Sequence, residues 1–100
     1  MTAYVLLEIE VTDLAALAEY REIGQKAVAE FGGEYLMVNA KPEAVEGTWD
    51  GTKGLTLLSF SSMEKARAWY NSDTYAPGIE IAKRAMIRRV AILPGLGETA

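Results

Sequence analysis

Residues 46–75 read EGTWDGTKGLTLLSFSSMEKARAWYNSDTY, and this stretch decides the fold. Its segment 54–60, GLTLLSF, is short, apolar and bounded by turn residues, as a strand buried on both faces should be. The S-x-x-E pattern that follows predicts a capped helix, with Ser61 as the N-cap, or Ser62 if the boundary lies one residue later. Residues 71–74, NSDT, are of types that bond their own backbone, so they are expected to end this helix.

The rest of the chain supplies a long helix and further strands. Asp13 is expected to cap a helix that ends at the glycine pair beginning with Gly32. A second helical segment should begin near Pro77, because proline is tolerated in a first turn. We expect one domain over residues 1–95 and a short tail over 96–100. Alternating or continuous apolar patterns predict strands over residues 3–11, 34–39, 54–60 and 85–93.

The order strand, helix, strand, strand, helix, strand is that of the α+β ferredoxin-like fold, βαββαβ. It predicts a four-stranded antiparallel sheet with both helices on one face, in which the first and third strands are central. The other face of the first strand is mixed, because it carries Tyr4, Leu6, Glu8 and Glu10. A lone domain would leave this apolar area in water, so we expect a homodimer in which two sheets pack together as a dimeric α/β barrel.

Composition excludes several classes of protein. Half of the 100 residues are hydrophobic, yet no run of about 18 apolar residues and no secretory leader is visible. The net charge of −4 opposes binding to a polyanionic backbone, so nucleic acid is not an expected partner, and neither is a membrane. Cysteine is absent, which excludes disulfides and thiol nucleophiles and fits a cytoplasmic protein.

Histidine is also absent. The side chain most often used as a general base, a haem ligand or a zinc ligand is therefore missing. A Ser-His-Asp triad is impossible, and no glycine-rich phosphate loop is present. We expect no bound cofactor and no metal site.

The segments AYVLLEIEVTD, AEY, FGGEYL, EG and LLSFSSMEKARAWYNSDTY together resemble one family over nearly the whole chain. It is the domain-of-unknown-function family thirteen-thirty, a group of small dimeric α/β-barrel proteins. The family often has proline where this chain has Ser61 and Leu14. The resemblance implies a homodimer, and relatives on the same plan that include cofactor-free monooxygenases, haem-degrading enzymes and lactone isomerases. A shared fold does not by itself carry their chemistry to this chain.

Glu46 is the candidate catalytic residue, in the loop position that resembles the family's EG pair. A carboxylate beside Trp49 in a semi-apolar pocket would have a raised pKa, which suits a general acid or base. The alternative reading is a turn carboxylate that bonds nearby amides. Trp49 itself is expected to cover the domain's own core, or else to form a pocket wall or a subunit contact.

Further candidate ligand-binding residues are Ser72 and Tyr75, which resemble the family's S-x-x-Y pattern, and Arg84, which would hold an anionic group. A structural corner and solvated ion pairs are the alternatives. Glu8 and Glu10 share a strand face, and cross-strand pairing with an arginine of the last strand explains them more simply than an acid/base pair does.

Two functions are left open. One is a cofactor-independent enzyme, monooxygenase-like or isomerase-like, that acts on a small organic molecule. The other is a non-catalytic small-molecule-binding or structural dimer. The first rests on Glu46, Trp49, Ser72, Tyr75 and Arg84 converging on a cavity, and their scattering over the surface would favour the second.

Overall fold

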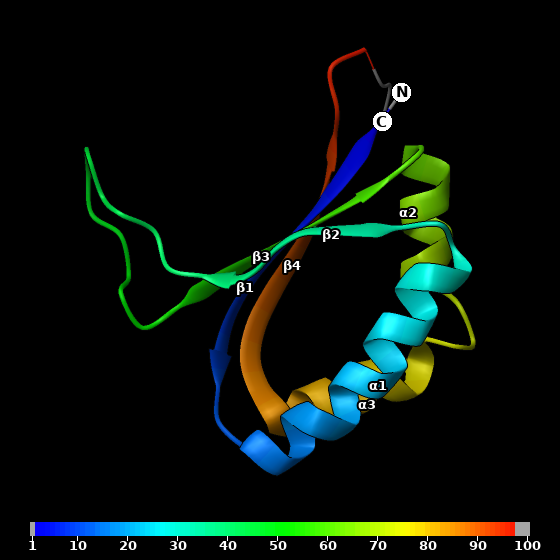
Figure 1. Cartoon of the computed structure of the whole chain (residues 1–100), viewed down its shortest axis with the longest axis horizontal. Helices are drawn as coiled ribbons and strands as arrows, with labels where there is room; N and C mark the ends of the chain where they lie inside the picture. The colour runs from blue at the N-terminus through cyan, green and yellow to red at the C-terminus, as the bar shows by residue number, and fades with distance from the viewer. Residues whose placement is uncertain (1, 98–100) are drawn as a thin grey trace.

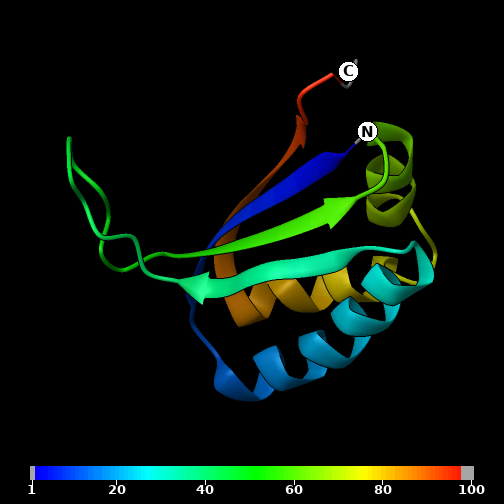
Figure 2. The same ribbon diagram turned by 45° about the horizontal axis from the view of Figure 1, so that its top comes forward.

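The computed structural model describes residues 2–97 and has the predicted ferredoxin-like order of elements. The four strands form one antiparallel sheet in the order β2-β3-β1-β4, so the first and third strands are central as predicted. All helices lie on one face of this sheet (Figures 1 and 2). The elements are β1 (Ala3–Val11), α1 (Leu14–Glu30), β2 (Glu34–Ala40), β3 (Gly54–Phe60), α2 (Met63–Tyr70), α3 (Ala76–Ala85) and β4 (Met86–Pro94).

Strand β1 carries the core because its side chains alternate between the two faces of the sheet. Ala3, Val5 and Leu7 are buried under the helices, whereas Tyr4 and Leu6 on the other face are only partly covered. This alternation follows directly from the period of two in an extended chain. The sheet thus has one covered face and one open, partly apolar face.

Helix α1 begins and ends where its sequence predicts. The Asp13 carboxylate accepts a hydrogen bond from the amide of Ala16 at 3.1 Å, which satisfies a free donor of the first turn. Gly32 follows the helix with φ at 70°, a conformation that glycine adopts without steric cost. Leu17 and Val28 are buried on the face turned toward the sheet.

Helix α2 is capped by Ser62, not Ser61. The Ser62 hydroxyl accepts from the amide of Lys65 at 3.0 Å, and Ser61 is exposed. Strand β3 ends at Phe60, so the chain needs one more residue to turn into the helix. The alternative cap, Ser62, is therefore the one used, and because Lys65 and not Glu64 then lies three residues after the cap, the S-x-x-E box is not formed.

The loop over residues 41–53 projects from the end of the sheet, away from the helices (Figures 1 and 2). Trp49 on this loop is 54% exposed, and Val45 is 88% exposed. The expectation that Trp49 covers the core of its own domain is therefore wrong. The loop extends the β2–β3 hairpin outward, so its side chains lie beyond the layer of helices that encloses the core.

Strand β2 is an irregular edge strand. Its register against β3 shifts between Tyr35 and Met37 and again between Met37 and Ala40. Asn39, near the second shift, has a positive φ of 48°. Such irregularities turn side chains out of strict alternation, which is why β2 contributes both Val38 and Asn39 to the space beneath the sheet.

Within residues 2–97, no helix is long and apolar enough to cross a membrane.

Candidate functional site

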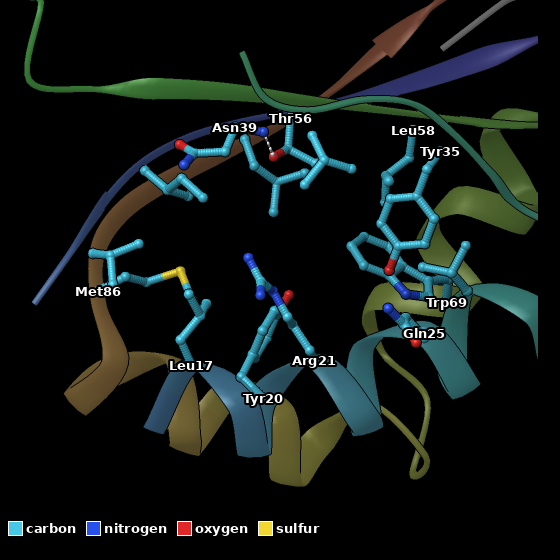
Figure 3. Close-up of a pocket in the computed structure, with 15 residues that line it drawn as sticks. Leu17, Tyr20, Arg21, Gln25, Tyr35, Asn39, Thr56, Leu58, Trp69 and Met86 are labelled. Carbon is cyan, nitrogen blue, oxygen red and sulfur yellow. Dashed lines mark hydrogen bonds between the residues drawn. The ribbon is translucent and has the colours of Figure 1, made fainter. Parts of the chain in front are cut away.

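A cavity of about 280 Å³ lies between the covered face of the sheet and helix α1 (Figure 3). Every strand contributes to its wall, and α2 closes one end through Trp69. The lining residues are Leu7, Ile9, Val11, Leu17, Tyr20, Arg21, Gln25, Val28, Tyr35, Val38, Asn39, Thr56, Leu58, Trp69 and Met86. Most of these side chains are apolar, so the cavity suits a molecule with an apolar body.

The polar side chains of the lining are mostly hydrogen-bond donors or neutral groups. Arg21 and Gln25 stand one turn apart on α1, and Figure 3 shows both reaching toward the cavity. On the opposite wall, the hydroxyl of Thr56 accepts from the amide of Asn39 at 3.0 Å. The lining holds one cation, Arg21, and no Asp or Glu. Within residues 2–97, no three carboxylates gather where they could hold a metal ion.

Trp69 is the most buried large side chain of this wall, with 1% of its surface exposed. Its indole ring lies 4.5 Å from the ring of Tyr75 and 5.4 Å from that of Phe60, measured between centroids. The indole Nε1–H is buried and has no hydrogen-bond partner among the residues described. An unsatisfied buried donor costs about 1–3 kcal/mol, so an acceptor that reached this N–H would be favoured. Because the nitrogen itself is fully buried, neighbouring side chains must move before a ligand atom can reach it.

Tyr35 lines the same end of the cavity as Trp69 and Gln25 (Figure 3). Burial raises the pKa of the Tyr35 phenol above its usual value, and the nearby Tyr75 raises it further. A tyrosine phenol is protonated at neutral pH even without this shift, so Tyr35 can donate a hydrogen bond into the cavity.

Tyr20, Tyr75 and Arg88 form a cluster behind the cavity wall. The hydroxyls of Tyr20 and Tyr75 are 2.5 Å apart, and Arg88 Nη1 donates to them at 3.2 and 2.9 Å respectively. Of the three, only Tyr20 lines the cavity. The pKa of the Tyr75 phenol is raised far above its usual value, mainly by burial. The cluster holds Tyr20 in place as a rigid part of the wall.

The two loop residues predicted for the site lie away from this cavity. Glu46 is exposed, makes no ion pair with any other residue between 2 and 97, and does not line the cavity. Trp49 is exposed on the same projecting loop. The physical reason is the outward course of residues 41–53, which sequence pattern alone does not specify.

The other three predicted residues have structural contacts. The hydroxyl of Ser72 donates to the carbonyl of Trp69 at 2.8 Å and accepts from the amide of Tyr75 at 3.1 Å, which forms the corner between α2 and α3. Tyr75 is fully buried and does not line the cavity, but its ring packs on Trp69, which does. Arg84 forms an exposed ion pair of 2.7 Å with Glu19. None of the five predicted residues lines the cavity, so one chain alone does not assemble that constellation.

The open face of the sheet carries the predicted cross-strand ion pair. Arg89 donates to both oxygens of Glu8, at 2.9 and 3.2 Å, and the two residues are directly opposite in the β1–β4 register. Glu10 pairs with Lys53 at 3.1 Å. The predicted pairing with an arginine of the last strand is confirmed for Glu8, whereas Glu10 pairs with a lysine of the loop before β3 instead.

Two signals in the sequence could have located the cavity. Thr56 is the only polar side chain on the buried side of β3, where Leu58 and Phe60 are its neighbours. Arg21 and Gln25 flank the apolar stripe of α1 at a spacing of four residues. Trp69 carries no such signal, because a buried tryptophan in a helix is normally a core residue.

Comparison with solved structures finds several proteins of similar fold. RPA0582, a protein of unknown function from Rhodopseudomonas palustris, has a TM-score of 0.71 at 12% identity over 92% of this chain and 80% of its own. SnoaB, a cofactor-independent oxygenase from Streptomyces nogalater, has a TM-score of 0.59 at 10% identity over 94% of this chain and 92% of its own. Rv0793 from Mycobacterium tuberculosis has a TM-score of 0.59 at 14% identity over the whole of both chains. At these identities the likeness shows the fold alone.

Sequence comparison is informative at the level of the family. No curated protein matches the chain. The model of the family described as Domain of unknown function (DUF1330) matches residues 2–96. The match spans nearly the whole sequence, including both the cavity wall and the projecting loop. This chain therefore belongs to the DUF1330 family.

Proposed function

We propose that the cavity between the sheet and α1 binds a small organic molecule with an apolar body and an acceptor oxygen. The observation that carries the proposal is the buried Nε1–H of Trp69, which has no partner among residues 2–97 and belongs to a side chain that lines the cavity. A ligand oxygen at this position would satisfy the donor and gain a hydrogen bond shielded from water.

The size of the cavity limits the ligand. An engineered apolar cavity of about 150 Å³ binds benzene, and sites for drug-sized ligands begin at about 300 Å³. A cavity of about 280 Å³ therefore suits a molecule of one or two rings or an equivalent chain. The apolar walls from β1 and α1 favour a ligand that is mostly hydrocarbon.

The donors determine the polarity of the ligand. Trp69 and the protonated Tyr35 both offer hydrogens at one end, Arg21 adds a positive charge, and the lining has no carboxylate to repel an anion. A carbonyl, phenolate, enolate or carboxylate oxygen matches this set. A ligand whose only polar group is a cation does not.

For the reaction, we propose a cofactor-independent enzyme of the monooxygenase or isomerase type that uses the donors of this cavity, since the five residues expected from the sequence do not converge on it. Donors aimed at a ligand oxygen would stabilise an enolate or phenolate, which is the species that such reactions need. SnoaB shares the fold and is a cofactor-independent oxygenase, although a likeness at 10% identity supports only the plausibility of this chemistry on the fold. The alternative is a non-catalytic binding or structural dimer, which needs only the cavity or the open sheet face.

We also propose that the chain acts as a homodimer through the open face of its sheet. Leu57 lies opposite Leu6 on this face, and Ile87 and Leu93 are exposed there at 59% and 41%. In such a dimer the projecting loop, with Glu46 and Trp49 exposed on it, would contact the second subunit. A role for Glu46 in proton exchange would require that contact.

A matched pair of variants tests binding. A thermal-shift screen of phenols, lactones and small organic acids should give ligands that stabilise the protein. Trp69→Phe removes the Nε1–H and keeps an aromatic ring, so it should weaken these ligands by about tenfold, the value of one buried hydrogen bond. Trp49→Phe makes a similar change on the exposed loop and should leave their affinity unchanged. Equal affinity in both variants would contradict the proposed role of Trp69.

Oxygen consumption separates the two functions. Ligands from the screen are incubated with the protein alone, without flavin or added metal, and dissolved oxygen and products are followed. Turnover that disappears in Trp69→Phe supports the enzyme. Binding without oxygen uptake or isomerised product supports the non-catalytic alternative.

A further inference from the structure

A second cleft, of about 310 Å³, lies between α3 and β4. It is lined by Tyr70, Ile79, Ala82, Lys83, Met86, Arg88 and Val90. Only Met86 is shared with the lining of the first cavity. The second cleft therefore presents different side chains to solvent, and two of them are cations.

Arg88 is the unusual residue of this cleft. It is partly buried on the covered side of β4, with its guanidinium 5.4 Å and 5.9 Å from the ring centroids of Tyr20 and Tyr75. Its Nη1 donates to both phenol oxygens. The two tyrosines thus hold the guanidinium in a fixed orientation and satisfy one of its three nitrogens.

The positive charge of Arg88 has no carboxylate partner among residues 2–97, whereas its neighbour Arg89 pairs with Glu8 and Arg84 pairs with Glu19. Arginine cannot neutralise itself by losing a proton, and a partly buried charge without a counter-ion is unfavourable. Its Nε and Nη2 hydrogens have no acceptor in the described part of the chain. These two nitrogens form the planar edge that pairs with a carboxylate.

We infer that this cleft binds the carboxylate group of a small organic acid. The free Nε–Nη2 edge of Arg88 would hold the two carboxylate oxygens in parallel hydrogen bonds. Lys83 adds a second positive charge at the cleft, although it also pairs with the exposed Glu80 at 2.7 Å. Ile79 and Val90 provide an apolar wall for the hydrocarbon part of the acid.

A carboxylate fits this cleft better than a phosphate does. The guanidinium offers a single planar edge, because Nη1 is already committed to Tyr20 and Tyr75. A phosphate is tetrahedral and carries up to two charges, which usually recruit several cations or a row of backbone N–H groups. The apolar side chains beside Arg88 would stay in contact with water around a phosphate, whereas an organic acid covers them.

Nuclear magnetic resonance can test the inference on the unaltered protein. The Nε–H of Arg88 is assigned in a ¹H–¹⁵N spectrum, and sodium benzoate is titrated at constant ionic strength. The Arg88 signal should move and reach saturation, while the Nε–H of Arg89 should not. Benzamide, which is neutral and of the same shape, should have no effect on Arg88.

Affinities of matched variants complete the test. Arg88→Gln should weaken benzoate binding by about tenfold or more, the range for a hydrogen bond to a charged group. Arg89→Gln should bind benzoate normally, because Arg89 pairs with Glu8 on the open face of the sheet. Arg21 lines the first cavity and not this cleft, so Arg21→Gln should leave the benzoate affinity read from the Arg88 Nε–H signal unchanged, whatever benzoate does in the first cavity. An Arg88 signal that never saturates, equal binding in Arg88→Gln, or inorganic phosphate binding as tightly as benzoate would each overturn the inference. Trp69 does not line this cleft and phenylalanine keeps an aromatic ring at its position, so Trp69→Phe should leave the benzoate-induced shift of Arg88 unchanged, which distinguishes failure here from failure of the proposed function.

Discussion

At the scale of single residues, Tyr75 connects the parts of the molecule that carry the proposed functions. Its ring packs on Trp69 in the first cavity wall, and its hydroxyl meets Tyr20 and Arg88. The sequence suggested a hydroxyl that faces a ligand, whereas the structure buries it completely. Tyr75 therefore acts through the positions of its neighbours.

Because Tyr75 is buried, the free energy of unfolding should depend on pH in the alkaline range. Its folded-state pKa is raised, first by burial and then by Tyr20, whereas in the unfolded chain it should stay near 10.0. Above that pH the unfolded state binds fewer protons than the folded state, so stability is full below about 10 and falls as the pH rises. Urea unfolding between pH 8 and about 11 should show this fall, less steeply in Tyr75→Phe. Tyr35 also has a raised pKa, so some slope should remain. An identical slope in the variant would contradict the assignment.

At the scale of elements, the start of α2 distinguishes two adjacent serines. The hydroxyl of Ser62 satisfies the amide of Lys65, and Ser61 is exposed. Replacement of Ser62 with alanine should lower the free energy of unfolding by about 1 kcal/mol, as for other N-caps. Replacement of Ser61 should change it by less than about 0.5 kcal/mol. Both changes are measured by urea unfolding. A larger loss of unfolding free energy for Ser61→Ala than for Ser62→Ala would contradict the assignment of Ser62 as the cap.

The elements themselves could be predicted because their signals are local. Alternation in β1 and the continuous apolar run of β3 follow from which faces are buried, and Asp13 satisfies the first turn of α1 through its own side chain. The order of these elements then leaves few ways to form one sheet, and the observed order β2-β3-β1-β4 is among them.

The register shifts of β2 and the course of the projecting loop could not be predicted. Neither is set by a repeating pattern; both depend on how the β2–β3 hairpin extends beyond its neighbours. Trp49 was therefore misplaced over the core. The same hairpin geometry carries Glu46 away from the cavity.

The cavity could not be predicted because it is a space that side chains from several elements leave unfilled. Trp69 was expected in the core and is there, with 1% exposure. Its unsatisfied Nε1–H is visible only when the surroundings of the ring are known. The local hints were Thr56, a polar group on a buried face, and the pair Arg21 and Gln25 beside the apolar stripe of α1.

At the scale of the whole molecule, the open sheet face predicts self-association. Sedimentation at micromolar concentration should give twice the mass of the 10.9 kDa chain. Leu57→Lys places a charge at the centre of this face, opposite Leu6, and should give a monomer that still folds. Lys65→Glu on the exposed side of α2 is the control and should remain dimeric. A monomer in the unaltered protein would contradict the proposal.

The central claim is that the first cavity binds its ligand through the indole of Trp69. The chain has two tryptophans, so a ¹H–¹⁵N spectrum should show two indole N–H signals, which Trp49→Phe assigns. Addition of a ligand from the thermal-shift screen should move the Trp69 signal downfield to saturation, because its N–H gains an acceptor, and leave the Trp49 signal in place. A Trp69 signal that does not move while the ligand saturates the protein would contradict the account.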